Sequence, residues 1–302
     1  MNTKSLRFKL TDVCYILLMI LPLAAAITLK VLFSPASGGI EISGALVYFT
    51  VHLPLQDLPV SESQVNTWLV LITLLGLCLY LTHGISAKGG LRRQIVAEWI
   101  VEQTEKLVRT NMGEYFMGFS PFIAAIMGLS AFSSLQSLLG LYAPTSDLNV
   151  TAGWAILVFI LITFYKLKCG PLHYLKSFAE PVPFFAPMNL ISEVATPVSM
   201  AFRHYGNVLS GSVISVLIAT ALQGLTKMVL GWLPGFLGQF PFFQIGIPAI
   251  FSIYFDIFSG CLQAFIFAML TMLYVSGGFP AAEYFARQEK KRRKKAGKAS
   301  QS

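Results

Sequence analysis

The amino-acid sequence predicts an all-α, polytopic membrane protein with about six membrane-embedded helices. Of its 302 residues, 55% are hydrophobic and 12% are charged, whereas soluble domains carry about 25% charged residues. The net charge is +8, and eight of the 22 basic residues lie within 287–298. A basic tail of this kind is typical of contact with anionic lipid, so we expect no nucleic-acid partner.

Six apolar segments are the expected membrane helices. They are Val13–Phe33, Val65–Thr82, Tyr115–Tyr142, Thr151–Tyr165, Asn189–Leu225 and Ile245–Val275. A helix needs about 17–25 residues to cross the hydrocarbon core, so the short fourth segment is expected to use its flanking residues. The first segment follows basic residues, as a signal peptide does, but it is long and a weak cleavage site follows it. We expect a retained helix, with a cleaved signal peptide as the alternative.

The distribution of Lys and Arg predicts the orientation of these segments, because basic connections favour the cytoplasmic side. Basic connections alternate with connections that hold almost no Lys or Arg. The basic ones are the N-terminal tail, 84–112, 166–176 and the tail that begins at Arg287. We therefore expect both termini in the cytoplasm.

The second basic connection contains an amphipathic helix. Over Gln94–Arg109, apolar residues such as Ile95 and Trp99 alternate with Glu98 and Glu102. This helix is expected to lie on the cytoplasmic membrane surface, or to be a solvated connector.

The last two apolar segments are too long to cross the membrane directly. As helices, Asn189–Leu225 and Ile245–Val275 would extend about 55 Å and about 46 Å, against a hydrocarbon core of about 30 Å. They must tilt or bend, and Pro197 and Pro248 offer bend points. Joined by a short loop, they are expected to form an antiparallel hairpin.

Each of these two segments carries polar residues at helical spacing. The sets are Thr196, Ser199, Arg203, Gly206, Asn207 and Ser210 on the first, and Ser252, Asp256, Ser259, Gly260 and Gln263 on the second. Residues three and four apart share a helix face, so one polar stripe is expected on each helix. For the serines, an alternative is that they only permit close packing.

Arg203 is the most informative residue of the chain. The run Pro187–Leu225 contains only two charges, Glu193 and Arg203. A guanidinium cannot be neutralised by deprotonation, and an intramembrane Arg usually marks an ion pathway. Asp256 is a possible partner within the chain, but the hairpin geometry places Arg203 nearer to Gln263 and Asn207. Glu193 then lies toward the cytoplasm, and Asp256 toward the outside.

The residues that most often build catalytic or metal sites are scattered. The four Cys and four His show no paired spacing. The sequence contains neither a phosphate-binding glycine-rich loop nor a nucleophile arrangement. We therefore expect no cofactor, no metal and no catalytic site in this chain.

Three sequence runs resemble the signatures of subunit a of F-type ATP synthases. They are NLISE at 189–193 with PVSMAFRHYGN at 197–207 and Gly211, QAFIFAMLTMLY at 263–274, and PTSDLNVT at 144–151 after Gly140-Leu141. Their order and spacing match that family over roughly Gly84 to Val275.

The resemblance implies a role for each polar residue. Arg203 would face a rotating ring of c subunits, each of which carries an ion-binding carboxylate. Glu193 would be the acid of the cytoplasmic half-channel, and Asp256 would line the outer half-channel. Asn207 and Gln263 would form a polar pair near the Arg. An acid with its carboxylate at the membrane surface is the alternative for Glu193.

The resemblance also implies partners and location. The chain would be a non-catalytic subunit in the cell membrane that contacts the c-ring, the peripheral-stalk subunit b and lipid. The alternatives are an independent transporter or channel for an anionic substrate, and a scaffold protein. The sequence shows no internal repeat, which counts against a transporter. The coupling ion, H⁺ or Na⁺, depends chiefly on the ring.

The chain also departs from the family pattern. His204-Tyr205 replaces Leu-Phe after the Arg, and Ser212 lies where some members have an acid. We assign no role to His204. The expected domains are an extra helix and outer loop at 1–64, a subunit a-like domain at 65–280, and a basic tail at 281–302.

Overall fold

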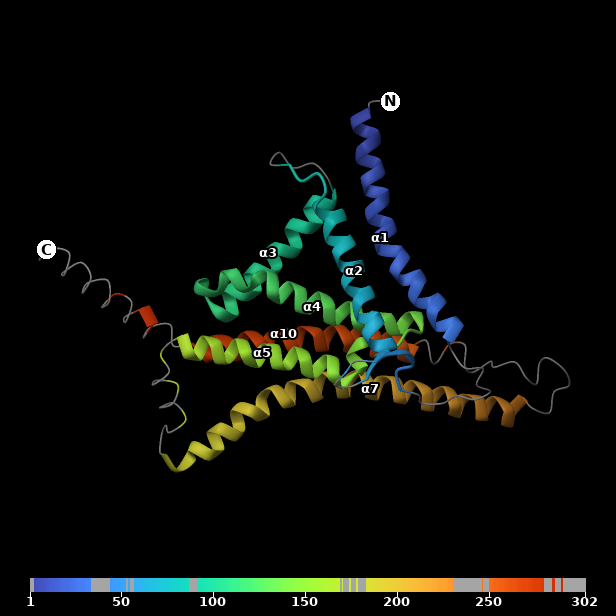
Figure 1. Ribbon diagram of the computed structural model, residues 1–302. Helices are drawn as coiled ribbons and strands as arrows, with labels where there is room; N and C mark the ends of the chain where they lie inside the picture. The colour runs from blue at the N-terminus through green and yellow to red at the C-terminus, as the bar shows by residue number, and fades with distance from the viewer. Residues whose placement is uncertain are drawn as a thin grey trace, which may run out of the picture.

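The computed structural model describes residues 3–33, 44–52, 54, 57–86, 92–168, 170, 174, 178, 183–230, 246, 250–279, 284–285 and 289 (Figure 1). Its helices are α1 (Thr3–Phe33), α2 (Glu62–Thr82), α3 (Arg92–Met112), α4 (Ser120–Leu135), α5 (Leu148–Lys168), α7 (Ala186–Leu230) and α10 (Gly260–Gly277). A π-helix, Ile253–Ser259, leads into α10. The prediction of an all-α class is confirmed.

Among the described residues, six helices are long and apolar enough to cross a membrane, as predicted. They are Phe8–Phe33, Glu62–Thr82, Glu114–Leu139, Leu148–Lys168, Ala186–Leu230 and Ile250–Gly277. The fourth has 21 residues, so the short apolar segment does use its flanks. The third combines α4 with short 3₁₀ turns, Glu114–Phe119 before it and Gln136–Leu139 after it.

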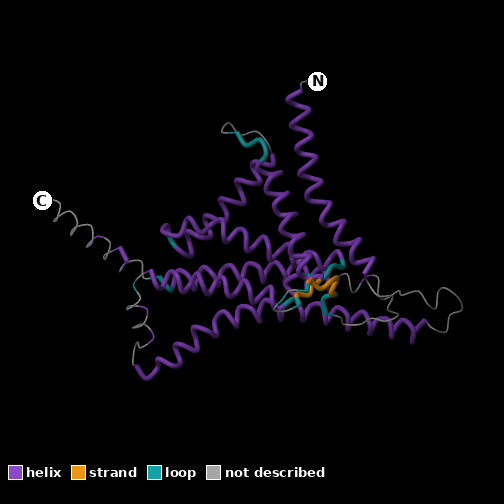
Figure 2. Tube along the Cα trace, viewed as in Figure 1, coloured by secondary structure: helices purple, strands orange, loops and turns teal. Residues whose placement is uncertain are grey.

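One element was not predicted. Strands β1 (Val47–Val51) and β2 (Leu58–Ser61) pair in an antiparallel hairpin before α2, the one sheet among the described residues (Figure 2). The β1 sequence VYFTV consists of β-branched and aromatic residues, which favour strands. Only the lack of basic residues in this connection entered the sequence prediction, so its strand pattern was missed.

The helices do not form a parallel bundle. α1 and α2 run across the direction of α4, α5 and α10, which lie side by side, with α7 along their lower edge (Figure 1). α7 has 45 residues, about 68 Å of helix. It bends and runs antiparallel to α10 (Figure 1), so the predicted pairing of two long antiparallel helices is confirmed, while the expected short loop and Pro248 lie outside the described residues. If α1 and α2 stand along the membrane normal, α7 and α10 are strongly inclined to it.

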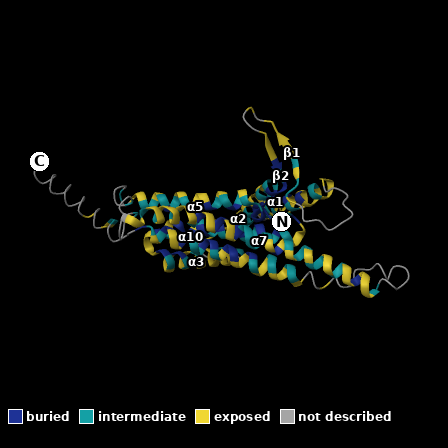
Figure 3. Cartoon of the chain, turned by 90° about the horizontal axis from the view of Figure 1, so that it is seen from below, coloured by how far each residue is buried: buried dark blue, intermediate teal, exposed yellow. Residues whose placement is uncertain are grey.

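The apolar core lies between α3, α4, α5 and α10. It includes Val108, Ile123, Val158 and Phe267, which are almost fully buried. The outer faces of α3, α5 and α7 expose many residues (Figure 3), and many of these are large and apolar. This arrangement is typical of a protein surrounded by lipid, because lipid does not drive apolar side chains inward.

The predicted amphipathic helix is α3. Its last turns belong to the core through Val108 and Met112, whereas Ile95, Trp99 and Val101 are more than half exposed. A solvated connector would expose such a run of apolar side chains to water. The exposed face therefore favours the membrane-surface interpretation.

α1 is fixed to the rest of the molecule near both ends. At one end, Asp12 accepts a hydrogen bond from Arg93 at 2.7 Å and lies 2.9 Å from His83. At the other, Lys30 lies 3.3 Å from Glu62, whose side chain is 3% exposed. Between them α1 lies close to α2 at Gly76, where a Cβ would be 3.0 Å from the Met19 side chain.

Candidate functional site

Arg203 lies on the outward face of α7. Its side chain is exposed, whereas the neighbouring side chains that turn toward the core, those of Met200, Ala201 and His204, are 2%, 4% and 0% exposed. In the part of the chain that the structure describes, Arg203 forms no ion pair. The guanidinium therefore points away from the core of its own protein.

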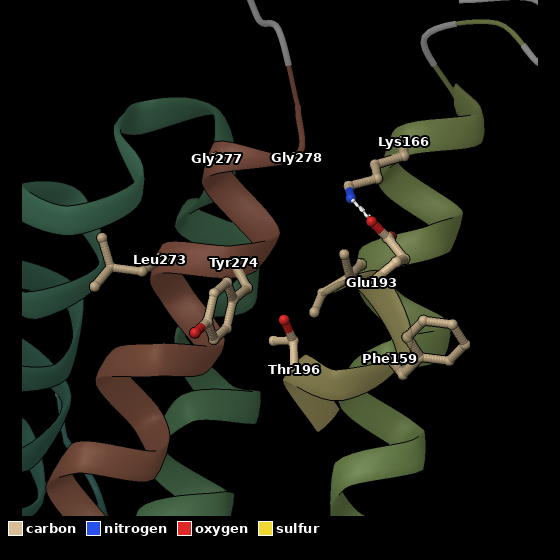
Figure 4. Close-up of a pocket in the computed structure, with 9 residues that line it drawn as sticks. Phe159, Lys166, Glu193, Thr196, Leu273, Tyr274, Gly277 and Gly278 are labelled. Atoms are coloured by element: carbon tan, nitrogen blue, oxygen red, sulfur yellow. Dashed lines mark hydrogen bonds and ion pairs between the residues drawn. The ribbon is translucent and has the colours of Figure 1, made fainter. Parts of the chain in front are cut away.

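Glu193 does have a partner within the chain. Lys166 of α5 donates to both carboxylate oxygens of Glu193, at 2.7 and 2.6 Å (Figure 4). The Glu193 side chain is 14% exposed, which argues against an acid held at the surface. Burial and the Glu193 carboxylate raise the pKa of Tyr174, which hydrogen-bonds to it. Sequence reasoning used Lys166 only to predict orientation and missed this pair.

The Lys166–Glu193 pair lines a pocket of about 200 Å³ between α5, α7 and the end of α10. Thr196 and Tyr274 extend into the same space (Figure 4). Ten residues separate Glu193 from Arg203 on α7, about 15 Å along the helix axis. The mostly buried Glu193 carboxylate is therefore held by Lys166 in a pocket that lies well away from Arg203.

Asn207 bonds to Ser259, which differs from the expected pair with Gln263. Asn207 Nδ2 donates to the Ser259 carbonyl at 3.4 Å, and Ser259 Oγ donates to Asn207 Oδ1 at 3.0 Å. Gln263 is 6% exposed. Within the described residues, Arg203 hydrogen-bonds to neither Asn207 nor Gln263. The structure thus brings Asn207 to the π-helix and leaves the guanidinium outside this contact.

Asp256 lies in the π-helix and is half-buried. It forms no ion pair with any described residue, so the possible Arg203–Asp256 pair is absent. The π-helix packs closely on α7, because a Cβ on Gly211 would lie 3.1 Å from Cβ of Phe255. Asp256 therefore lies in a segment that packs against α7, but it forms no ion pair with a described residue of α7.

The predicted polar stripe of the second long helix is interrupted. A π-helix closes its hydrogen bonds over one residue more than an α-helix, so α-helical spacing is wrong across Ile253–Ser259. After it, Gly260 faces α4 so closely that a Cβ would lie 2.5 Å from the Ser134 side chain. Asp256 and Gln263 consequently do not share one face in the way that the spacing predicted. π-helical turns are frequent at functional sites.

The two departures from the family pattern lie in different surroundings. His204 is fully buried, with Ser130 Oγ 3.1 Å from its Nε2. Ser212 is exposed and donates to the Leu209 carbonyl of its own helix. The inward direction of His204 follows from the outward direction of Arg203, since adjacent residues are about 100° apart on an α-helix.

Comparisons with known proteins identify the family of the chain. The sequence model of the family described as "ATP synthase A chain" matches residues 64–276, which include all three signature runs and exclude α1. A protein of Legionella pneumophila strain Philadelphia 1 named "ATP synthase subunit a" is 29% identical over 80% of this chain and 95% of its own length.

Two further relatives carry the same name. The protein of Trichlorobacter lovleyi is 30% identical over 74% of this chain and 89% of its own length. The protein of Sulfurihydrogenibium sp. strain YO3AOP1 is 33% identical over 63% of this chain and 84% of its own length. The family match covers well over half of the chain and all helices from α2 to α10, so this multi-pass membrane protein belongs to the ATP synthase A chain family.

Proposed function

We propose that this chain is the ion-conducting stator subunit in the membrane sector of a rotary F-type ATP synthase. Two half-channels pass protons, or Na⁺, to and from carboxylates on a rotating c-ring, and Arg203 separates the two paths. The exposed position of Arg203 on α7, with no anion supplied by a described residue, carries the proposal. The missing anion is then the carboxylate of a ring subunit that passes α7.

Simple electrostatics supports this role. A charge about 4 Å away contributes on the order of 4 kcal/mol at an effective dielectric constant near 20. One pKa unit corresponds to about 1.36 kcal/mol, so Arg203 would lower the pKa of a passing carboxylate by about 3 units. That shift releases the bound ion. A membrane potential of about 100 mV supplies roughly 2.3 kcal/mol per charge to drive rotation.

The acids Glu193 on α7 and Asp256 on the π-helix suit opposite half-channels. Glu193 and Lys166 line the pocket at one end of the hairpin, on the side that the basic residues assign to the cytoplasm. Asp256 lies at the π-helix and serves the outer path. Asn207 and Gln263 are polar groups at the level where ions reach the ring, Asn207 through its bond to Ser259.

We extend the proposal to the partners, location and domains of the chain. The chain is a non-catalytic subunit whose partners are the c-ring, the peripheral-stalk subunit b and lipid, and it resides in the cell membrane with both termini in the cytoplasm. The ion-conducting domain spans 65–280, preceded by α1 and the outer loop and followed by the basic tail. An independent anion transporter is not favoured, because the relatives are named as ATP synthase subunits.

The test replaces Arg203 in the complete ATP synthase reconstituted into liposomes. We expect Arg203→Ala to abolish ATP synthesis driven by an imposed ion gradient, while subunit composition stays unchanged. Lys227→Ala is the matched control, because it removes an exposed cation farther along the same helix, and it should keep full synthesis. Full synthesis by Arg203→Ala would overturn the proposal, as would anion uptake by the chain alone.

A further inference from the structure

His204 connects α7 to three other helices. Its ring is completely buried, and its Nε2 lies 3.1 Å from Ser130 Oγ on α4. Trp154 of α5 and Phe267 of α10 contact the ring edge-on, with centroids 5.8 and 5.6 Å away. The His204 side chain thus fixes the position of α7 relative to α4, α5 and α10 at once.

If packing were its only role, a histidine at this site would be energetically unfavourable. Burying a polar group is unfavourable unless it is hydrogen-bonded, and Nδ1 of His204 is buried without a partner among the described residues. An apolar side chain would fill the space between Trp154 and Phe267 without leaving this nitrogen unpaired. What the histidine adds is a directional contact to Ser130, whereas apolar packing is non-directional.

The direction of the His204 side chain affects that of Arg203, because the two residues are adjacent in the chain. The two side chains point about 100° apart on the helix, so the inward direction of one fixes the outward direction of the other. One turn after Arg203, the bonds between Asn207 and Ser259 provide a second tether between α7 and the π-helix. The other inward residues near Arg203, Met200 and Ala201, are apolar and would tolerate rotation of α7 about its axis.

We infer that His204 is a positioning residue: its contact with Ser130 sets the rotation of α7 and thereby directs Arg203 toward the partner surface. The inference rests on the proposed function, which requires Arg203 to face outward. It concerns a residue at which this chain departs from the family pattern, so the family's properties do not supply it.

The test uses the complete reconstituted complex and four variants. His204→Leu and Ser130→Ala should each lower gradient-driven ATP synthesis roughly fivefold, the effect that loss of one hydrogen bond has on an equilibrium. The double variant should be no worse than His204→Leu, because both changes remove the same contact. Ser133→Ala is the matched control, a buried serine of the same helix, and it should keep the full rate.

A conservative variant separates positioning from ion transfer. His204→Gln places an amide near the position of Nε2 and should restore most of the rate, since an amide can bond to Ser130 but cannot carry a proton. Equal loss of synthesis in His204→Gln and His204→Leu would overturn the inference, because it would make His204 an ion carrier. A full rate in His204→Leu would also overturn it.

The rotational position of α7 about its own axis can be measured without an activity assay. In a complex whose native cysteines are replaced, spin labels at Val198→Cys on α7 and Ile156→Cys on α5 occupy exposed positions, and electron paramagnetic resonance gives their separation. His204→Leu should shift or broaden this distance distribution, and an unchanged distribution would contradict the inference. If Arg203→Ala kept full synthesis, the proposed function would fail instead, whatever the labels showed.

Discussion

The charges of the α1–α3 arm and those of the α7 surface are arranged in opposite ways. In the arm, Asp12 meets Arg93 and Lys30 meets Glu62, each across two helices. On α7 and the π-helix, Arg203 and Asp256 have no counter-charge among the residues described. Pairs within the chain hold helices together, because breaking one leaves an uncompensated charge. Charges left unpaired at membrane depth are available to something outside the chain.

The largest effect in this comparison, after that of Arg203 itself, is expected at Asp256. Asp256→Asn keeps the size of the side chain but removes its ability to exchange a proton. A positioned proton-transfer group contributes roughly 10²–10⁴ in rate, so ATP synthesis in the reconstituted complex should fall at least about tenfold if protons are the coupling ion. Asp57→Asn is the control, an acid between β1 and β2 that is 62% exposed. Equal rates in both variants would remove Asp256 from the ion path.

An intermediate effect is expected at Lys166–Glu193, an ion pair within the chain whose acid lies on α7, the helix that also carries Arg203. Lys166→Met leaves a largely buried carboxylate alone and should lower ATP synthesis and the thermal stability of the complex. Adding Glu193→Gln should recover the stability but not the rate. Lys168→Met, on the same helix end, is the control. If the double variant also recovered the rate, the pair would be structural, as in the arm.

The smallest effect on rate is expected in the arm. Lys30→Met combined with Asp12→Asn removes both contacts that fix α1, so the complex should unfold at a temperature a few degrees lower while ATP synthesis at 25 °C stays unchanged. Thermal denaturation and the synthesis assay on the same preparation measure both. Since these contacts suit a permanent helix, the mass of the purified chain should include residues 1–33. A shorter mass would show that the segment is a cleaved signal.

Features that a single segment encodes were predictable. The charge-poor surroundings of Arg203 predicted that no acid of its own helix pairs with it, and segment lengths predicted the long antiparallel hairpin. The extra residues of α5 also followed from length alone. Each of these depends on local spacing and on the thickness of a bilayer.

Features that depend on how helices meet were not predictable. Lys166 and Glu193 are 27 residues apart, and only the approach of α5 to α7 makes them partners. The Asn207–Ser259 contact likewise needs two helices in place. The π-helix replaced the expected α-helical register over Ile253–Ser259, where Phe255 packs against Gly211.

The π-helix changes how positions in this part of the chain should be matched to one another. If residues before Gln263 are assigned to helix faces with an α-helical period, each assignment across the π-helix is wrong by one residue, which is about 100° around the helix axis. The residue chosen as facing α7 is then not the one that does face it. Deleting one residue within Ile253–Ser259 would turn the segment into ordinary α-helix and swing the Asp256 carboxylate sideways, while both ends of the helix kept their places. The direction in which the Asp256 carboxylate points therefore depends on the number of residues in this segment as well as on the identity of the side chain.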